Sequence, residues 1–173
     1  MDVVATGCVT DRVPLVGADG WSALWNRRHL LAGESGLHVA RIEHLLSRYG
    51  SLVHEVLALI AADPGLADPL PSSDDYLRAE VVYAATHEGA LHLDDVLARR
   101  TRISIESWDR GVDAAPVVAA LMGEVLGWSG EQRAREIEHY EKRVSAERDA
   151  QRQPNDETAD AARLGAPDIV PLG

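Results

Sequence analysis

The stretch that most constrains the fold has apolar residues at helical spacing followed by a cluster of arginines. Residues 76–102 read YLRAEVVYAATHEGALHLDDVLARRTR. Leu77, Val81 and Ala84 form one apolar line, which is the periodicity of a helix with a buried face. After Gly89, acidic residues come first and arginines last, an order that complements a helix dipole. The stretch therefore predicts two short helices hinged at Gly89, with this glycine ending the first.

Capping residues and alternation predict where these elements begin and end. Ser72 and Asp75 have the spacing of a capping box, so we expect the first helix to start there. The second helix should span roughly 93–100. Residues 103–106 alternate apolar and polar types as a strand does, but the sequence offers no second strand to pair with them. We therefore expect an extended connector at 103–106.

Four more segments show helical periodicity. Gly50 can end the first and Ser51 can cap the second, and so short a turn predicts antiparallel neighbours. Asp113 can cap the third, whose apolar stripe is wide, and Ser129 with Gln132 forms another capping box before a long surface helix. The segments are 37–49, 52–62, 113–127 and 129–152.

Together these patterns predict an all-α fold, a small bundle of about five to six helices packed as antiparallel pairs, with irregular N- and C-terminal segments. The helical domain should span 37–152. Residues 153–173 are polar and contain three prolines, which predicts a flexible tail.

Charge and cysteine content exclude several classes of protein. The net charge of -11 and a pI near 5.0 disfavour binding to nucleic acid. The single cysteine, Cys8, excludes an intrachain disulfide and a cysteine-rich metal site, as in a reduced cytoplasmic protein. No apolar run approaches the ~20 residues that a transmembrane helix needs, and the N-terminus lacks the pattern of a signal peptide.

The seven histidines do not form a recognisable metal motif. His87 and His92 are five residues apart, whereas the zinc helix needs a spacing of four to place both rings on one face. Glu136 and His139 match one Glu-x-x-His pair of a di-iron bundle, but such a site needs two. Glycine-rich phosphate loops are also missing from the sequence. We therefore expect no catalytic, cofactor-binding or metal-binding residue in this chain.

A buried carboxylate and an arginine cluster are the best candidates for a specific role. Glu80 lies among apolar residues of its helix and needs a partner, which Arg99 or Arg100 could supply as a charged fork. We predict a structural pair between Glu80 and one of these two arginines. Two alternatives remain open, in which these arginines, with Arg102, contact an anionic ligand or a neighbouring domain.

Two tryptophans lie close together near the N-terminus. Trp21 and Trp25 are four residues apart and share one helical face. They could face a partner domain or fold back on the core of this chain, and the sequence does not distinguish the two.

The residue pattern of the central stretch resembles that of one enzyme family. It follows Y-L-x-A-E-V-x-Y-A and then E-x-A-x-x-L-x-D-V-L-x-R-R-T-R, a pattern of the C-terminal helical domain of FAD-dependent (aerobic) glycerol-3-phosphate dehydrogenases. The matching residues are Tyr76, Leu77, Ala79, Glu80, Val81, Tyr83, Ala84, Glu88, Ala90, Leu93, Asp95, Val96, Leu97 and Arg99 to Arg102.

This resemblance implies a fragment of a larger flavoenzyme. The full-length family oxidises glycerol 3-phosphate to dihydroxyacetone phosphate with FAD and passes the electrons to membrane quinone. Its flavin and substrate residues lie in an N-terminal part whose fingerprint is missing from this sequence, so residues 1–36 would be the end of the flavin domain and a linker. The implied partner is the FAD and substrate domain, and the parent enzyme would be cytoplasmic or peripheral to the inner face of the membrane. A homo-oligomer, a stand-alone helical interaction module and a small independent enzyme stay open as alternatives.

Overall fold

A computed structural model describes residues 7–165. The chain divides into two compact units, Met1–Ala62 and Asp63–Gly173, which we call the N-terminal and C-terminal units. Helices dominate both, and the described residues contain one small sheet of two strands. This confirms the predicted all-α class. The boundary at 62/63 falls inside the 37–152 segment that the sequence suggested as a single domain.

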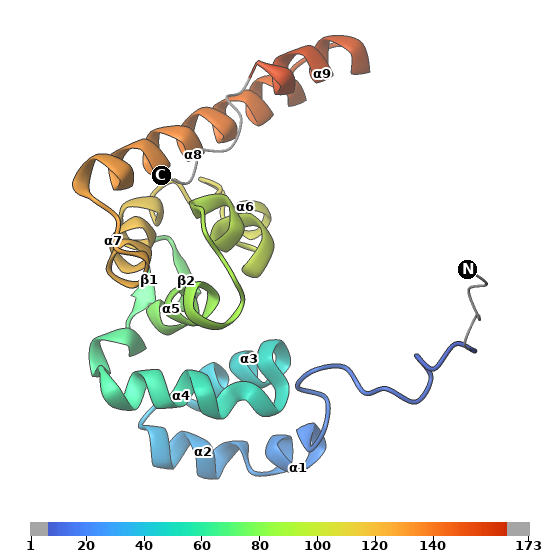
Figure 1. Ribbon diagram of the computed structural model, residues 1–173, viewed down its shortest axis with the longest axis vertical. Coiled ribbons are helices and arrows are strands. Elements are labelled where there is room, and N and C mark those ends of the chain that lie inside the picture. Colours follow the sequence, from blue (N-terminus) through green and yellow to red (C-terminus); the bar gives the residue numbers. More distant parts are fainter. Residues whose placement is uncertain (1–6, 166–173) are drawn as a thin grey trace, which may run out of the picture. The chain divides into compact units, whose positions relative to one another are not determined.

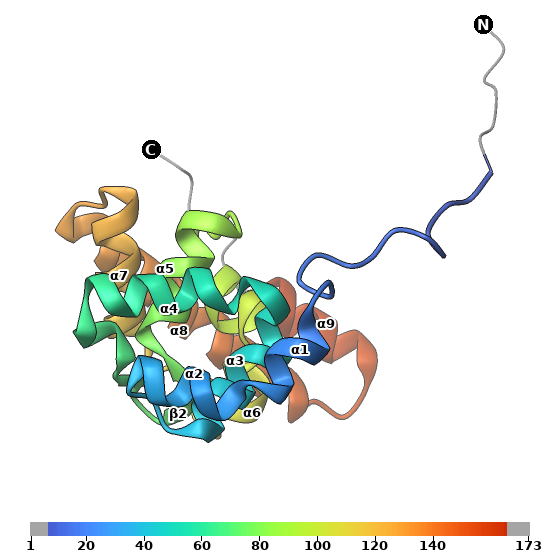
Figure 2. The ribbon, with the colours of Figure 1, turned by 90° about the horizontal axis from the view of Figure 1, so that it is seen from below.

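The described residues of the N-terminal unit form four short α-helices. They are α1 (Trp21–Asn26), α2 (Arg28–Ser35), α3 (Val39–Tyr49) and α4 (Val53–Ala62), with a 3-10 turn at Gly50–Leu52 between the last two. Helix α2 packs across α3 (Figure 2). The predicted helices at 37–49 and 52–62 are confirmed as α3 and α4. Their buried residues are Ile42, Leu45, Leu46, Tyr49, Val53, Val56 and Ile60.

A glycine interrupts the helical run between α3 and α4. Gly50 has φ 58°, and the Ser51 amide donates to the Gly17 carbonyl at 2.8 Å. A Cβ atom at Gly50 would lie only 2.0 Å from that carbonyl oxygen, so no other residue fits here. The next helix therefore starts from a 3-10 turn, and the Ser51 cap stays a prediction.

Within the described residues, one helical run, Val39–Ala62, is long and apolar enough to cross a membrane by length and composition. The break at Gly50 divides it into helices of 11 and 10 residues. At 1.5 Å per residue each reaches only about half of a ~30 Å hydrocarbon core. Because Ile42, Leu45 and Val56 on this run are buried in the protein, it is explained as a pair of core helices.

The C-terminal unit begins with a 3-10 turn at Pro64–Ala67 and an antiparallel pair of strands, β1 (Pro69–Leu70) and β2 (Ser73–Leu77). The prediction that a helix starts near Ser72 was wrong, because this segment pairs as a strand. Ser72 has φ 53° in the turn, and its hydroxyl donates to Asp113 at 2.8 Å. Helix α5 (Arg78–His87) follows β2 directly.

The hinge at Gly89 is confirmed. Helix α5 ends at His87, and Gly89 has φ 68°, the left-handed conformation that glycine adopts at little cost. The predicted second helix lies in the expected place, but its last turns, Asp95–Arg100, are π-helical. The Thr101 amide donates to the Val96 carbonyl at 2.8 Å, a bond across five residues that closes the wider turn.

Residues Ile103–Glu106 form a short helix, α6, so the predicted extended connector was wrong. The amides of Ile105 and Glu106 both donate to the Arg102 carbonyl, which closes a helical turn. The alternation of apolar and polar types reflects one buried side chain, Ile103, and one exposed side chain, Ile105.

Three helices complete the C-terminal unit: α7 (Ala115–Leu126), α8 (Gly130–Gln151) and α9 (Asp156–Leu164). Helix α7 packs against both α5 and α8 (Figure 1). The Ser129 hydroxyl accepts from the Gln132 amide at 3.1 Å, which confirms the predicted cap of α8. The predicted Asp113 cap was wrong, because the N-cap residue of α7 is Ala114 and the Asp113 carboxylate accepts from Ser72.

Helix α9 occupies part of the segment that we expected to be a loose tail. The Asn155 side chain accepts from the Thr158 amide at 3.0 Å and caps the helix. The helix packs on α8, where Ala150 and Ala159 are both buried. Residues 166–173 of the expected tail, like residues 1–6 of the expected remnant, lie outside the described residues.

Candidate functional site

Glu80 is fully buried and caps the start of α5. Its carboxylate accepts a hydrogen bond from the Leu77 amide at 2.9 Å. This satisfies one of the amides that a helix leaves unpaired at its N-terminus. Leu77 has no side-chain acceptor, so Glu80 supplies the cap that the sequence had suggested at Ser72.

The three arginines of the predicted cluster contact different partners. Arg99 forms ion pairs with Asp94 at 2.7 Å and with Asp95 at 2.6 Å, both close to it along the chain. Arg100 donates two hydrogen bonds to the Glu88 carbonyl at the C-terminus of α5, and Arg102 pairs with Glu106 at 3.4 Å. Arg99 therefore pairs with carboxylates that are close to it in the sequence. The predicted pairing of Glu80 with Arg100 stays a prediction.

Asp95 is held as a carboxylate by several donors. Burial by itself raises the pKa of this group. The Leu91 amide at 3.0 Å, the Arg99 guanidinium and the His92 amide at 3.1 Å outweigh burial, so the pKa of Asp95 lies below its ordinary value. This carboxylate organises the turn that precedes the π-helix.

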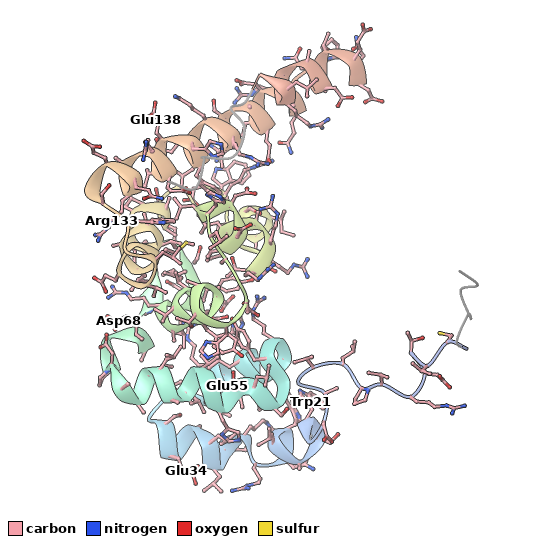
Figure 3. The ribbon with its side chains drawn as sticks, in the orientation of Figure 1. Trp21, Glu34, Glu55, Asp68, Arg133 and Glu138 are labelled. Atoms are coloured by element: carbon pink, nitrogen blue, oxygen red, sulfur yellow. The ribbon has the colours of Figure 1, made fainter. Side chains whose placement is uncertain are left out.

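The two N-terminal tryptophans stack on each other. Their ring centroids are 5.3 Å apart with an interplanar angle of 23°. The Trp21 indole N–H donates to the Leu46 carbonyl at 3.0 Å, and the Arg28 guanidinium lies over Trp25 and pairs with Glu43. Both rings are thus packed by the N-terminal unit itself. Trp21 remains 37% exposed. Figure 3 labels it on α1.

Two of the histidines make defined side-chain contacts in the C-terminal unit. The ring of His87 stacks on Tyr83 with centroids 4.6 Å apart, and His92 Nδ1 lies 2.8 Å from the buried Glu136 carboxylate. Across residues 7–165, no three His, Cys, Asp or Glu side chains are grouped closely enough to hold a metal ion.

A groove that sequence reasoning missed lies between α6 with its following loop and the last turns of α8. Its volume is about 760 Å³. Its walls combine apolar and cationic side chains, and the residues that characterise it are Ile105, Glu106, Trp108, Arg110, Arg148 and Arg152. A sequence signal existed, since Ile105 and Trp108 are large apolar residues in an otherwise polar run. Its cationic wall could not be foreseen, because Arg148 is 40 residues away along the chain.

The backbone of Arg110 takes an uncommon conformation beside this groove. Arg110 has φ 61° and the adjacent Gly111 has φ 82°. A non-glycine residue with positive φ costs of order 1 kcal/mol or more and persists only when its surroundings hold it. Here the Tyr140 hydroxyl donates to the Arg110 carbonyl at 2.6 Å, and the Arg110 guanidinium pairs with Glu147. Burial raises the pKa of Tyr140, with nearby carboxylates adding to the effect, so this phenol remains a donor.

Comparison with known proteins places the chain in a family. A family model described as the C-terminal domain of alpha-glycerophosphate oxidase matches residues 8–133. The chain is 49% identical over 160 residues to glycerol-3-phosphate dehydrogenase 2 of Mycobacterium tuberculosis and to a glycerol-3-phosphate dehydrogenase of Mycobacterium leprae, covering 92% of this chain. A glycerol-3-phosphate dehydrogenase of Synechocystis is 30% identical over 138 residues, 79% of this chain and 24% of that protein. No solved structure is significantly similar.

The extent of these matches shows which part of its relatives the chain corresponds to. The chain spans only 27% of the length of the mycobacterial relatives. The family match begins at Cys8 and covers the capped helix α5, the hinge at Gly89 and the arginine cluster after it. The chain therefore belongs to the family of C-terminal domains found in alpha-glycerophosphate oxidase and the glycerol-3-phosphate dehydrogenases.

Proposed function

We propose that this chain is the accessory helical domain of a FAD-dependent glycerol-3-phosphate dehydrogenase and is not catalytic alone. The full-length enzyme would oxidise glycerol 3-phosphate to dihydroxyacetone phosphate. The observation that carries the proposal is the combination of 49% identity along nearly the whole chain with coverage of only about a quarter of each relative.

The residues of this chain do not fit FAD. Dinucleotide-binding folds hold the pyrophosphate at a glycine-rich turn between a parallel strand and a helix. The described residues have one antiparallel pair of short strands, and the sequence has no such glycine pattern. The buried carboxylates instead serve the fold, since Glu80 caps α5 and Glu136 accepts from the Leu93 amide. Any flavin would therefore be held by the flavin domain of the proposed parent enzyme.

The proposed partner is the flavin and substrate part of the parent enzyme. In such an enzyme this chain would act in the cytoplasm or at the inner face of the membrane, as its acidic composition and lack of cysteine pairing favour.

A chimera tests the proposal. These residues would replace the corresponding quarter of the Mycobacterium tuberculosis dehydrogenase. We expect bound flavin and glycerol 3-phosphate oxidation close to those of the unaltered enzyme, whereas a version without any C-terminal quarter should lose both. A chimera that folds and holds flavin but cannot oxidise the substrate would contradict the proposal.

Titration of FAD into the isolated chain gives a second test. We expect no saturable change in flavin fluorescence. Stoichiometric flavin binding, or substrate turnover by this chain, would show that it carries a site of its own.

A stand-alone helical interaction module is the alternative. The nearly complete exposure of Trp108 beside the groove favours it, because large exposed aromatic side chains mark interaction surfaces. This alternative predicts that the chimera fails while the isolated chain binds a protein partner through the groove.

A further inference from the structure

Four of the eleven large apolar side chains that are exposed in the described part of the chain lie within one stretch, residues 9–16. They are Val9, Val13, Leu15 and Val16, and the last two are 83% and 88% exposed. Figure 2 shows this stretch leading away from the four helices of the N-terminal unit. Contact of so many aliphatic groups with water is unfavourable, and such concentrations of exposed apolar surface mark sites that another protein surface covers.

Two hydrogen-bonded turns give the stretch a defined backbone. The Arg12 amide donates to the Val9 carbonyl at 2.9 Å, and the Leu15 carbonyl accepts from the amide three residues further on, also at 2.9 Å. Pro14, between the two turns, has no amide hydrogen to give to a neighbouring strand. The stretch is therefore ill suited to pair edge to edge with a second copy of itself, as a free β-strand would.

A close approach of two glycines anchors the stretch to the N-terminal unit. The Gly17 carbonyl accepts from the Ser51 amide at 2.8 Å. Gly17 has φ 84°, and a Cβ atom added to it would lie 2.6 Å from the Tyr49 carbonyl oxygen. This contact therefore needs glycine at 17 as well as at 50. The exposed side chains that precede Gly17 thus start from a fixed point of the unit.

The stretch lies at the start of the domain that the relatives share. The family match begins at Cys8 and includes it. Proteins that carry this domain at their C-terminus have further polypeptide before it, and this chain spans only 27% of the mycobacterial relatives. A surface at the start of the domain adjoins that polypeptide. A short covalent link gives the two an effective concentration of order millimolar, which favours this occupant over a separate molecule.

We propose that residues 9–16 form the surface by which this domain packs on the flavin part of the parent enzyme, an inference that rests on the proposed function. An apolar patch of the flavin part covers Leu15 and Val16 at the centre of the contact. Asp11 and Arg12, which pair with each other at 3.6 Å, lie at its polar rim. Interfaces between domains of one chain bury roughly 600–1,500 Å², and four aliphatic side chains can supply their apolar centre.

Limited digestion with trypsin tests the proposal, because Arg12 lies inside the stretch and its side chain is 82% exposed. The isolated 173-residue chain should be cut readily after Arg12. In the chimera with the Mycobacterium tuberculosis dehydrogenase, this cleavage should be at least about tenfold slower, because a docked segment is cut only while it is transiently released. Mass spectrometry of timed samples measures both rates.

Variants of Leu15 show whether the apolar contact causes the protection. In the chimera, Leu15→Asp should speed cleavage after Arg12 at least about fivefold, since an unpaired carboxylate is disfavoured in an apolar contact. In the isolated chain the same change should alter the rate by less than about twofold, because Leu15 is already exposed there. Leu15→Ser should act in the same direction by a smaller factor, and it serves if the charged chimera does not fold.

Leu164→Asp is the matched control. Leu164 is 85% exposed, as Leu15 is, but it lies on α9 outside the family match, so this change should alter neither rate. A chimera that oxidises glycerol 3-phosphate while Arg12 is cut as fast as in the isolated chain would overturn the inference and leave the proposed function standing. Protection that both Leu15 variants leave intact would overturn it as well.

Two further outcomes count against the inference. Protection of Arg12 in the isolated chain that increases with protein concentration would identify a second copy as the occupant and overturn it. A chimera that folds without flavin would contradict the proposed function itself, and this inference with it.

Discussion

The buried carboxylate of Glu136 on α8 joins two residues that precede the π-helix. His92 Nδ1 lies 2.8 Å from one carboxylate oxygen, and the Leu93 amide donates to the other at 3.2 Å. The Glu136 side chain is 2% exposed and that of His92 is 14% exposed. A carboxylate with so little access to water is tolerated only when hydrogen bonds replace its hydration. The two contacts of Glu136 therefore hold the segment after the Gly89 hinge against α8.

The first prediction concerns the buried contacts of Glu136. Glu136→Ala should lower the free energy of unfolding of the C-terminal unit by about 2–4 kcal/mol, because it leaves the Leu93 amide buried without an acceptor and opens a cavity. Glu136→Gln should cost less, since the amide oxygen can still accept one bond. Urea denaturation followed by circular dichroism measures both.

Glu138 provides the matched control on the same helix. It projects into solvent and pairs with Lys142 at 2.6 Å (Figure 3). Glu138→Ala should leave the denaturation midpoint unchanged. A loss of stability in Glu138→Ala as large as that in Glu136→Ala would mean that the helix surface, rather than the buried pair, is responsible.

The second prediction is the pairing of Glu80 with Arg100. Glu80→Ala should cost about 1–3 kcal/mol of unfolding free energy through loss of the Leu77 cap alone. If the carboxylate also pairs with Arg100, a double-mutant cycle with Arg100→Ala should give a coupling energy above about 0.5 kcal/mol. Additive effects would rule out the pair while leaving the capping role intact. Arg99→Ala should not couple to Glu80, because Arg99 is held by Asp94 and Asp95.

Periodicity and capping chemistry predicted much of the fold because they act locally. The apolar faces of α3, α4, α5, α7 and α8, the glycine hinge and the Ser129 cap all follow from residues close together in the sequence. The wrong predictions concern segments whose structure is determined by contacts with residues far away in the sequence. Ser72 and Asp75 look like a capping box, but strand pairing with β1 and the hydroxyl bond to Asp113 across 41 residues hold the segment in another form.

The candidate site was less predictable for the same reason. A buried Glu80 in need of a partner could be predicted from its apolar neighbours, although its amide partner could not. The groove depends on α8 returning beside α6, which places Arg148 against the Trp108 carbonyl. Likewise, only the fold shows that Arg110 takes a left-handed conformation.

The third prediction is a pH dependence from Asp95. Its pKa is lower in the folded chain than in the unfolded chain, where it is about 3.9. Stabilisation by this carboxylate is therefore fully present above the unfolded value and is lost as the pH falls through the folded value. Asp95→Asn should cost about 1 kcal/mol at neutral pH, and the difference from wild type should shrink below about pH 4.

Urea denaturation at a series of pH values measures that difference. Asp160→Asn, at an exposed ion pair on α9, should stay close to wild type at neutral pH. A difference between wild type and Asp95→Asn that stays constant down to the lowest measurable pH would show that the charge of Asp95 is not what stabilises the turn.

The last prediction concerns Gly111, which adjoins Arg110 and the core. Gly111 has φ 82°, and a Cβ atom there would lie 2.7 Å from Ile103 Cγ2 and 3.3 Å from Leu97 Cδ2. Gly111→Ala therefore combines backbone strain with overpacking and should lower the free energy of unfolding by about 2–4 kcal/mol. Gly130→Ala is the matched control, because a Cβ at the first residue of α8 would meet nothing within 4 Å. That variant should be neutral or slightly stabilising. Thermal unfolding of both proteins separates these outcomes, and equal behaviour of the two would mean that the left-handed turn at Arg110 and Gly111 can relax without cost.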